Sequence, residues 1–237
     1  IYHMPRLNPW DYHYLKKLDE FFQQHKEYKI VHSHLDCLSA YPLKAAKKNG
    51  VPVRIAHSHN TSQEKNLKYL IKDYSKKQIP KYATHLFACG KEAGKWMFGK
   101  HKFQIMNNAI DAKKFIYNEE VRKQKRVELG VEDKFVIGHV GRFNLQKNHE
   151  FLVKRFADFA KTNEDAVLVL IGNGELQEKI KEMAKEYGIE TKVKFLGLRE
   201  DIPQLLQAMD LFLFPSLFEG LPVTLVEAQA AGLPCVI

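Results

Sequence analysis

Two carboxylates, Glu219 and Glu227, stand eight positions apart in the stretch FPSLFEGLPVTLVEAQAAG near the end of the sequence. Pro222 is typical of the first turn of a helix, and Gly232 of the position just after its last turn, so we expect a helix over about 222–231. Glu219 then lies in the loop before the helix, and Glu227 lies roughly 7 Å along the helix axis. The two acids are therefore expected in different settings, on either side of the helix start.

The start of this predicted helix has the properties of an anion site, because its first N–H groups lack partners within the helix and the helix dipole favours negative charge. The backbone groups concerned belong to Gly220, Leu221, Val223 and Thr224. A diphosphate bound there would leave one acid near each of its two substituents, and carboxylates accept hydrogen bonds from the hydroxyl groups of a nucleotide sugar. The alternative is structural, with one acid interacting with the dipole and one solvated acid. The residues leave the ligand-binding role and the structural role both open, although the apolar neighbours of Glu227 favour the ligand-binding role.

Two cations occur in the loop GRFNLQKN, residues 141–148, which follows a predicted strand. Arg142 and Lys147, together with free backbone N–H groups before the next helix, would hold a phosphate or diphosphate. A pair of surface cations and an ordinary Asn cap at Asn148 explain the same residues equally well. This loop is a candidate anion site that needs support from its neighbours.

Two glycine-rich loops follow other predicted strands. The glycines of Gly172-Asn173-Gly174 let the backbone approach a ligand closely, but they also suit any tight turn. The third glycine of a G-x-G-x-x-G fingerprint would fall at Gln177, which disfavours a nicotinamide dehydrogenase. The stretch GKEAGKW, residues 90–96, looks like a phosphate-binding P-loop, but its glycine spacing is one residue short and its last residue is Trp. We expect this second stretch to start a helix.

Strand-like and helical patterns alternate along nearly the whole sequence, as in parallel sheets covered by helices. The strands predicted are 28–32, 51–57, 84–89, 135–140, 167–171, 193–196 and 211–214. In such sheets ligands bind beyond the carboxyl ends of the strands. We therefore expect the loops at Gly141, Gly172, Gly197 and Pro215 to line one crevice.

Between 107 and 134 the sequence is dense in charge and has no regular apolar face. We interpret 108–134 as an interdomain linker. The predicted fold class is α/β, with an acceptor-side Rossmann-like domain at 1–107 and a nucleotide-sugar-binding Rossmann-like domain at 135–237. Both domains are expected to be partial, truncated at the ends of the chain.

The formal net charge of +9 implies an acidic partner such as a phosphorylated substrate, a nucleic acid or an anionic membrane surface. The sequence contains no apolar run of eighteen residues, so no membrane span is predicted. The cysteines Cys37, Cys89 and Cys235 are far apart and form no C-x-x-C pattern, which favours buried core thiols over disulfides or a zinc site.

Taken together, these motifs resemble the retaining glycosyltransferases of the GT-B fold, family 4 (glycosyl transferases group 1). The resemblance rests on Glu219 and Glu227 between FPS and AGLP, and on the Gly-Arg pair that precedes Lys147. VHSH at 31–34, GVP at 50–52 and NNAID at 107–111 are also similar to segments of that family. The stretch RIAHSHN at 54–60 resembles bacterial enzymes of capsular and exopolysaccharide assembly.

The resemblance implies transfer of a sugar from a nucleoside diphosphate, with uridine as the expected base, to a saccharide or lipid-linked saccharide acceptor. It implies no cofactor and no metal in the active site. Arg142 and Lys147 would neutralise the diphosphate as the glycosidic bond breaks. Glu219 would contact the transferred sugar and Glu227 the ribose. Backbone near Asn173, Gly174 and Leu198 would frame the base.

The family also has a histidine that reaches the sugar, and His57 and His59 compete for that place. The spacing does not decide between them. Two histidines at i and i+2 could also ligate a metal, but the sequence offers no evident third ligand. We expect His32 and His34 to line the crevice or to be hydrogen-bonded core residues.

A basic helix is predicted over 65–77, where Leu67, Leu70, Ile71 and Tyr74 follow helical spacing among five lysines. It is either a solvated charged face or a contact with an anionic membrane. The expected location is cytoplasmic, and membrane contact would place the protein at the inner face of the plasma membrane, where a lipid-linked acceptor is found. Nucleic-acid binding is disfavoured, because the aromatic residues do not alternate with the basic ones.

Two other functions share this fold. One is a non-catalytic GT-B module that binds nucleotide sugars, and the other is a GT-B sugar-nucleotide epimerase. The presence of Arg142, Lys147, Glu219 and Glu227 argues against the non-catalytic module.

Overall fold

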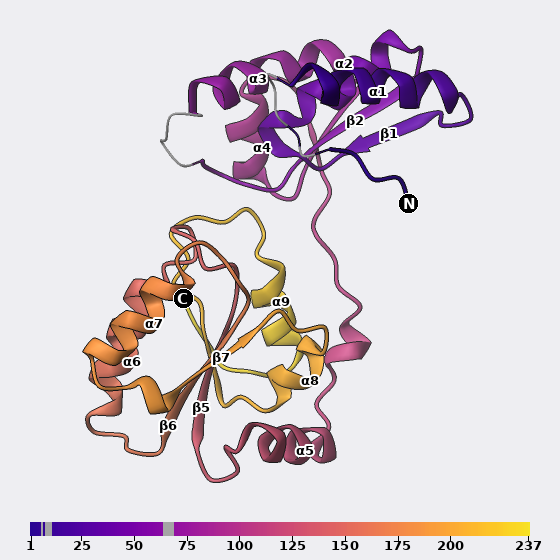
Figure 1. The fold of residues 1–237 in the computed structure, drawn as a ribbon. Helices are drawn as coiled ribbons and strands as arrows, with labels where there is room; N and C mark the ends of the chain where they lie inside the picture. The colour runs from indigo at the N-terminus through magenta and orange to yellow at the C-terminus, as the bar shows by residue number, and fades with distance from the viewer. Residues whose placement is uncertain (6, 8–10, 64–68) are drawn as a thin grey trace. The chain divides into compact units, whose positions relative to one another are not determined.

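The computed structural model describes residues 1–5, 7, 11–63 and 69–237 (Figure 1). The chain forms two compact units, one of Ile1–Asn108 with Phe218–Leu221, the other of Ala109–Leu217 with Pro222–Ile237. Each unit contains one sheet in which all the paired strands are parallel. The predicted fold class, an α/β chain with two Rossmann-like domains, is confirmed.

The first unit has four strands in the order β1-β2-β3-β4. They are β1 Ile30–Ser33, β2 Val53–Ser58, β3 His85–Ala88 and β4 Gln104–Ile105. The helices of this unit are α1 Tyr12–Gln24, η1 Asp36–Ser39, α2 Ala40–Lys48, α3 Tyr69–Tyr82 and α4 Lys91–Phe98. Each of the three strands predicted here lies within two residues of an observed strand. Helix α4 begins directly after Gly90, as predicted for the stretch that looks like a P-loop.

The core of the first unit contains two cysteine thiols. Cys37 and Cys89 are buried beside Leu43 and Ile79, whose side chains have no exposed surface. Burial raises the pKa of the Cys37 thiol to about 11, so it stays protonated at neutral pH. The prediction of buried core thiols is confirmed for these two residues.

The second unit has five strands in the order β7-β6-β5-β8-β9. They are β5 Phe135–Val140, β6 Ala166–Ile171, β7 Val193–Gly197, β8 Leu211–Leu213 and β9 Cys235–Val236. The helices are η2 Ala112–Phe115, α5 Glu119–Leu129, α6 His149–Ala160, α7 Gln177–Glu186, η3 Glu190–Lys192, α8 Ile202–Gln207 and α9 Val223–Ala230. The chain leaves β5 toward β6 on one side, and β8 lies on the other. The order therefore reverses between β5 and β8, the position where open α/β sheets bind ligands.

Both faces of this second sheet are buried. Along β6, Val167, Val169 and Ile171 belong to one core cluster, and the alternate residues Leu168 and Leu170 belong to the other. Helices α6 and α7 contribute side chains to the cluster of Leu168, while α8 and α9 contribute to that of Val169. A strand buried on both faces is apolar throughout, which is why 167–171 was recognisable as a strand.

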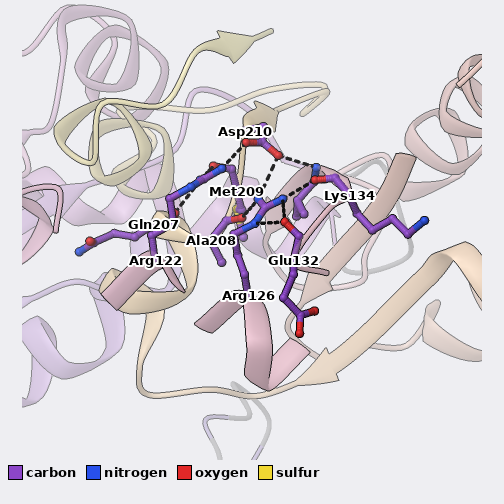
Figure 2. A network of polar contacts seen from close by, with 9 residues as sticks. Arg122, Arg126, Glu132, Lys134, Gln207, Ala208, Met209 and Asp210 are labelled. Atoms are coloured by element: carbon purple, nitrogen blue, oxygen red, sulfur yellow. Dashed lines mark hydrogen bonds and ion pairs between the residues drawn. The ribbon is translucent and has the colours of Figure 1, made fainter. Parts of the chain in front are cut away.

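The segment predicted as a linker, 108–134, carries secondary structure, and from Ala109 onward it belongs to the second unit. Phe115, Leu129 and Val131 lie in the core of that unit. Helix α5 lacks a regular apolar face because two of its inward contacts are made by arginine side chains (Figure 2). A helix attached in this way does not produce the apolar periodicity on which the sequence analysis depends.

Arg126 is the buried centre of this attachment, with 11% of its side chain exposed. It pairs with Asp210 at 3.2 Å and donates hydrogen bonds to the backbone carbonyls of Glu132, Lys134 and Ala208 (Figure 2). Arg122 pairs with the other oxygen of Asp210 at 2.5 Å. Helix α5 is thereby fixed to the turns that precede β5 and β8.

Asp210 receives both arginines and is partly buried. Burial opposes ionisation of its carboxyl, but the Val136 amide, 2.8 Å away, and the two guanidinium groups outweigh that effect. The pKa of Asp210 is therefore held below its usual value, and the carboxylate is charged at neutral pH.

Candidate functional site

The loops that follow β5, β6 and β7 lie side by side at the carboxyl edge of the second sheet. The first residue of two of these loops donates a hydrogen bond to the last residue of the neighbouring strand, from the Gly141 amide to Ile171 O (2.9 Å) and from the Gly172 amide to Gly197 O (2.8 Å). The structure thus brings together four residues predicted to bind a ligand, which are Arg142, Asn173, Gly174 and Leu198. The predicted crevice along this edge stays a prediction.

Gly174 has a packing role at this edge. A Cβ atom on Gly174 would lie 2.3 Å from the carbonyl oxygen of Phe143, and the Phe143 amide donates to Asn173 O at 3.0 Å. The two loops therefore pack backbone against backbone, which only glycine permits. The predicted contact of Asn173 and Gly174 with a base stays a prediction.

Arg142 is exposed and pairs with Glu175, whose carboxylate oxygen lies 3.2 Å from Nε and 3.0 Å from Nη2. The backbone amide of Glu175 and the Arg142 guanidinium hold the pKa of this carboxyl below its usual value. An anionic ligand at this edge would exchange one acidic partner of Arg142 for another.

Lys147 lies on the loop between β5 and α6, with its Nζ 4.8 Å from the centre of the Phe214 ring, just beyond β8. Asn148 has a φ of 54° and makes no capping bond to α6. Its side chain instead donates to Pro215 O at 3.2 Å. The loop after β5 is therefore tied to the loop after β8, the two strands between which the sheet order reverses.

Two buried histidines that the sequence analysis missed pack next to this loop. His139 on β5 donates a hydrogen bond through Nδ1 to Leu213 O (2.8 Å), and a Cβ on Gly141 would lie 2.9 Å from its Nε2. His149 stacks on Phe143 with ring centres 4.1 Å apart. Neither His139 Nε2 nor the ring nitrogens of His149 have a hydrogen-bond partner among the described residues. No pattern in the sequence distinguishes these histidines from ordinary strand and helix residues.

Burial keeps both of these histidines neutral. It lowers the pKa of His139 to about 4 and that of His149 to about 3, and the Lys147 ammonium adds to the effect in each case. The loop that carries Arg142 and Lys147 therefore packs against neutral imidazoles. At neutral pH these two histidines add no positive charge next to the two cations.

Helix α9 spans Val223–Ala230, which confirms the prediction of a helix over about 222–231. Pro222 occupies the position before it and supplies no side-chain capping bond. Thr224 Oγ1 is buried and has no partner among the residues that the structure describes. Pro222 thus leaves the first-turn N–H groups of α9 without an N-cap side chain, and a binding role for them stays a prediction.

Glu227 lies farther along α9 and is half-buried. Within the described part of the chain, its carboxylate has no hydrogen-bond or ion-pair partner, and burial raises its pKa. Buried carboxylates are normally paired or hydrogen-bonded, because burial of a lone charge is costly. Glu227 is therefore a carboxylate with unused hydrogen-bonding capacity, as expected of a residue that receives a ligand.

Three further predicted residues, Glu219, Gly220 and Leu221, belong to the first unit. The backbone carbonyls of Glu219 and Leu221 accept hydrogen bonds from the Thr61 hydroxyl (2.8 Å) and the Asn108 amide (2.9 Å). The two acids of the stretch thus belong to different units, and the predicted contact of Glu219 with a sugar stays a prediction.

Gly220 is closely packed within the first unit. A Cβ atom at this position would lie 2.0 Å from the carbonyl oxygen of His59 and 2.8 Å from the Cys89 sulfur. Glycine is therefore required here by backbone packing, independently of any ligand.

The competing histidines His57 and His59 stand next to His32 and His34 in the first unit. His57 Nδ1 lies 3.2 Å from His32 Nε2, and His59 Nε2 lies 2.8 Å from His34 Nδ1. His32 and His34 are hydrogen-bonded as expected, but both are exposed and are not core residues. Burial, followed by the neighbouring imidazoles, lowers the pKa of His57 to about 4.

The predicted basic helix lies partly outside the described residues, since Lys65, Leu67 and Lys68 are not among them. In α3, Leu70 and Tyr74 are exposed, whereas Asp73 pairs with Lys76 (3.5 Å) and Lys77 (2.7 Å). None of the helices described in the structure is both long enough and apolar enough to span a membrane.

Comparison with known families gives a match for the second half of the chain. Residues 120–237 match the family described as glycosyl transferases group 1. These residues belong to the glycosyl transferases group 1 family. The matched residues include Arg142, Lys147 and Glu227 of the second unit and Glu219 of the first unit.

Similarity to individual relatives extends over nearly the whole chain. "Putative glycosyltransferase EpsF" of Bacillus subtilis (strain 168) is 37% identical over 235 residues, which cover 94% of this chain and 61% of that protein. An Escherichia coli protein named UDP-Gal:alpha-D-GlcNAc-diphosphoundecaprenol alpha-1,3-galactosyltransferase is 29% identical over 225 residues, 90% of this chain and 58% of that protein. The chain thus spans about three fifths of the length of these relatives.

Solved structures similar to this chain include Anabaena Alr3699/HepE in complex with UDP-glucose, with a TM-score of 0.81 and 23% identity over 92% of this chain and 62% of that one. Sucrose-phosphate synthase from Thermosynechococcus elongatus has a TM-score of 0.76 and 21% identity over 99% of this chain and 66% of that one. These similarities confirm the GT-B fold predicted for this chain.

Proposed function

We propose that this chain transfers a sugar from a UDP-sugar to a lipid-linked saccharide acceptor, with retention of anomeric configuration, in the synthesis of a surface polysaccharide. The observation that carries the proposal is Glu227, a half-buried carboxylate without a partner among the described residues, in the same unit as Arg142 and Lys147. Such a carboxylate suits the hydroxyl groups of a ribose, and the two cations suit a diphosphate.

The donor would bind at the carboxyl edge of the second sheet. The first-turn N–H groups of α9, from Val223 and Thr224, would receive diphosphate oxygens, and Arg142 would leave Glu175 to pair with them. Positive charge at this position stabilises the diphosphate more strongly as it becomes the leaving group than in the intact donor. The base would lie against the backbone of Asn173 and Leu198, on the neighbouring loops.

Glu219 and one of the two histidines His57 and His59 are the proposed contacts to the transferred sugar. Glu219 would accept hydrogen bonds from sugar hydroxyls, and His57 or His59 would contact the sugar or the leaving oxygen. His57 is neutral at pH 7, because its pKa is lowered to about 4, so it could accept or donate a hydrogen bond without carrying charge.

The acceptor class is inferred from relatives. The Escherichia coli relative named above and a Campylobacter jejuni protein, 30% identical over 131 residues, both carry names that include diphosphoundecaprenol or diphospho-undecaprenol. A lipid-linked acceptor requires access to a membrane surface. The exposed side chains of Leu70 and Tyr74, with the lysines of the same segment, would bind the inner leaflet from a cytoplasmic location.

A transfer assay tests this proposal on the full chain. A panel of UDP-sugars is incubated with a diphosphoundecaprenol-linked saccharide, and the anomeric configuration of the product is read from NMR coupling constants. We expect a retained product and a turnover roughly 100-fold lower in Glu219→Gln. The matched control is Glu186→Gln, which changes an exposed acid on α7. An inverted product, or an epimerised sugar nucleotide formed without acceptor, would overturn the proposal.

A further inference from the structure

Four histidines gather on one face of the first sheet. Strands β1 and β2 pair in parallel with Ser33 opposite Ala56, so the residues that follow each of them, His34 and His57, are neighbours. Side chains alternate along a strand, which places His32 on the same face as His34, and His59 on the same face as His57. The cluster thus follows from the pattern His-x-His repeated on two adjacent strands.

The ring nitrogens of this cluster are close enough to share one ion. One nitrogen from each of His32, His34 and His57 lies within 4.8 Å of the others. A tetrahedral ion with bonds of about 2.0–2.1 Å to nitrogen needs ligand atoms roughly 3.4 Å apart. His32 Nε2 and His57 Nδ1 are 3.2 Å apart, which is close to that spacing, and the His34 ring would move toward them as an ion binds.

Hydrogen bonds outside the cluster fix the orientation of two rings. His57 Nε2 lies 3.2 Å from Met106 O, and a carbonyl only accepts, so the proton of the neutral ring is on Nε2 and Nδ1 keeps its lone pair toward His32. His59 Nδ1 lies 3.1 Å from Asn108 Oδ1, and the amide nitrogen of Asn108 donates a hydrogen bond to Leu221 O. Histidines that ligate metals are held in the same way, by an oxygen acceptor on the other ring nitrogen.

We propose that His32, His34 and His57 bind one Zn²⁺ or similar divalent transition-metal ion, with His59 orienting His34. Three neutral imidazoles favour such ions over Mg²⁺ or Ca²⁺, which prefer oxygen ligands. Three protein ligands leave a fourth position for water or another ligand. His32 and His34 are exposed, which gives the ion a path to the buried His57. The site is built within the first unit and includes His57, one of the two histidines proposed to contact the sugar, so binding of the ion is measured without donor or acceptor.

Metal binding is tested directly with Co²⁺ on the full chain, without a polyhistidine tag. We expect one Co²⁺ per chain with the intense visible absorption of tetrahedral coordination, displaced by one equivalent of Zn²⁺. His57→Gln is expected to weaken binding by more than roughly 100-fold, and His59→Gln by roughly 10- to 100-fold. His32→Gln and His34→Gln test the same site at exposed positions, in case His57→Gln does not fold.

The matched control is His85→Gln, an exposed histidine on β3 of the same sheet. Its affinity for Co²⁺ should equal that of the unchanged chain. The weak absorption of octahedral Co²⁺, or an equal loss of affinity in His85→Gln and His32→Gln, would overturn the proposal. Binding of several ions with no dependence on His32 or His34 would have the same consequence.

Discussion

Replacement of Arg126 by Met should destabilise the second unit far more than any exposed change on the same helix. Breaking a buried ion pair costs roughly 3–5 kcal/mol when it leaves the partner charge unpaired. Here Asp210 keeps Arg122 at 2.5 Å and the Val136 amide at 2.8 Å. We therefore expect the lower end of that range, about 3 kcal/mol, lost from the free energy of unfolding of the second unit.

Native-state hydrogen exchange measures this loss within each unit. Amides of β5 that exchange through unfolding of the second unit should exchange roughly 100-fold faster in Arg126→Met, since about 1.4 kcal/mol corresponds to a factor of ten. Amides of β2, in the first unit, serve as the internal reference and should keep their rates. The control variant Lys123→Met changes a side chain of α5 that is 61% exposed and whose surface ion pairs contribute little.

The reasoning would be refuted if β5 exchanged at the same rate in Arg126→Met as in Lys123→Met. In that case α5 would not be fixed to the sheet by its arginine, and the segment would be a linker, as the sequence suggested. Equal acceleration in β2 would contradict the division into two units.

Three further predictions follow from particular contacts. Gly220→Ala should lower the stability of the first unit because its Cβ would meet His59 O at 2.0 Å. Urea unfolding followed by tryptophan fluorescence measures the loss, because both tryptophans of the sequence precede residue 109, and an unchanged midpoint would contradict the prediction. The part of the second unit's stability that depends on neutral His139 and His149 should be fully present above about pH 6.5 and be lost as pH falls toward about 4. The folded pKa values of His139 and His149, about 4 and about 3, lie below the unfolded value near 6.5, so protons favour the unfolded chain. Urea unfolding followed by circular dichroism at pH 7 and 5 should show this loss, and His149→Phe should reduce it. The double variant Leu70→Gln, Tyr74→Gln should float less with anionic vesicles than the unchanged chain, whereas Tyr187→Gln, on the second unit, should float equally; equal flotation of all three would exclude α3 as a membrane contact.

Sequence patterns predicted the elements whose burial is made by apolar residues. The strand at 135–140 coincides with β5, and α9 lies within one residue of its predicted ends, because Pro and Gly mark where a helix begins and stops. Helix α5 was not predicted as part of the second unit, because Arg122 and Arg126 make inward contacts where a packed helix usually has an apolar stripe.

The candidate site was predicted to a similar extent. Loops after parallel strands meet at one edge, so Arg142 and Asn173 could be grouped without coordinates. The two-residue spacing of His32 and His34, repeated at His57 and His59, was visible in the sequence, but the pairing of β1 with β2 is a long-range contact that spacing alone does not supply. His139 and His149 gave no signal, because a neutral buried histidine follows the same pattern as any core residue.

Binding of UDP to the full chain, measured by isothermal titration calorimetry, tests the central claim most directly. We predict one site per chain, with affinity reduced roughly tenfold to 100-fold by Glu227→Gln, because a hydrogen bond to a charged group contributes roughly 1.5–3 kcal/mol. Glu186→Gln, on an exposed turn of α7, should bind UDP as the unchanged chain does. Absence of UDP binding, or equal affinity in Glu227→Gln and Glu186→Gln, would contradict the proposed donor site.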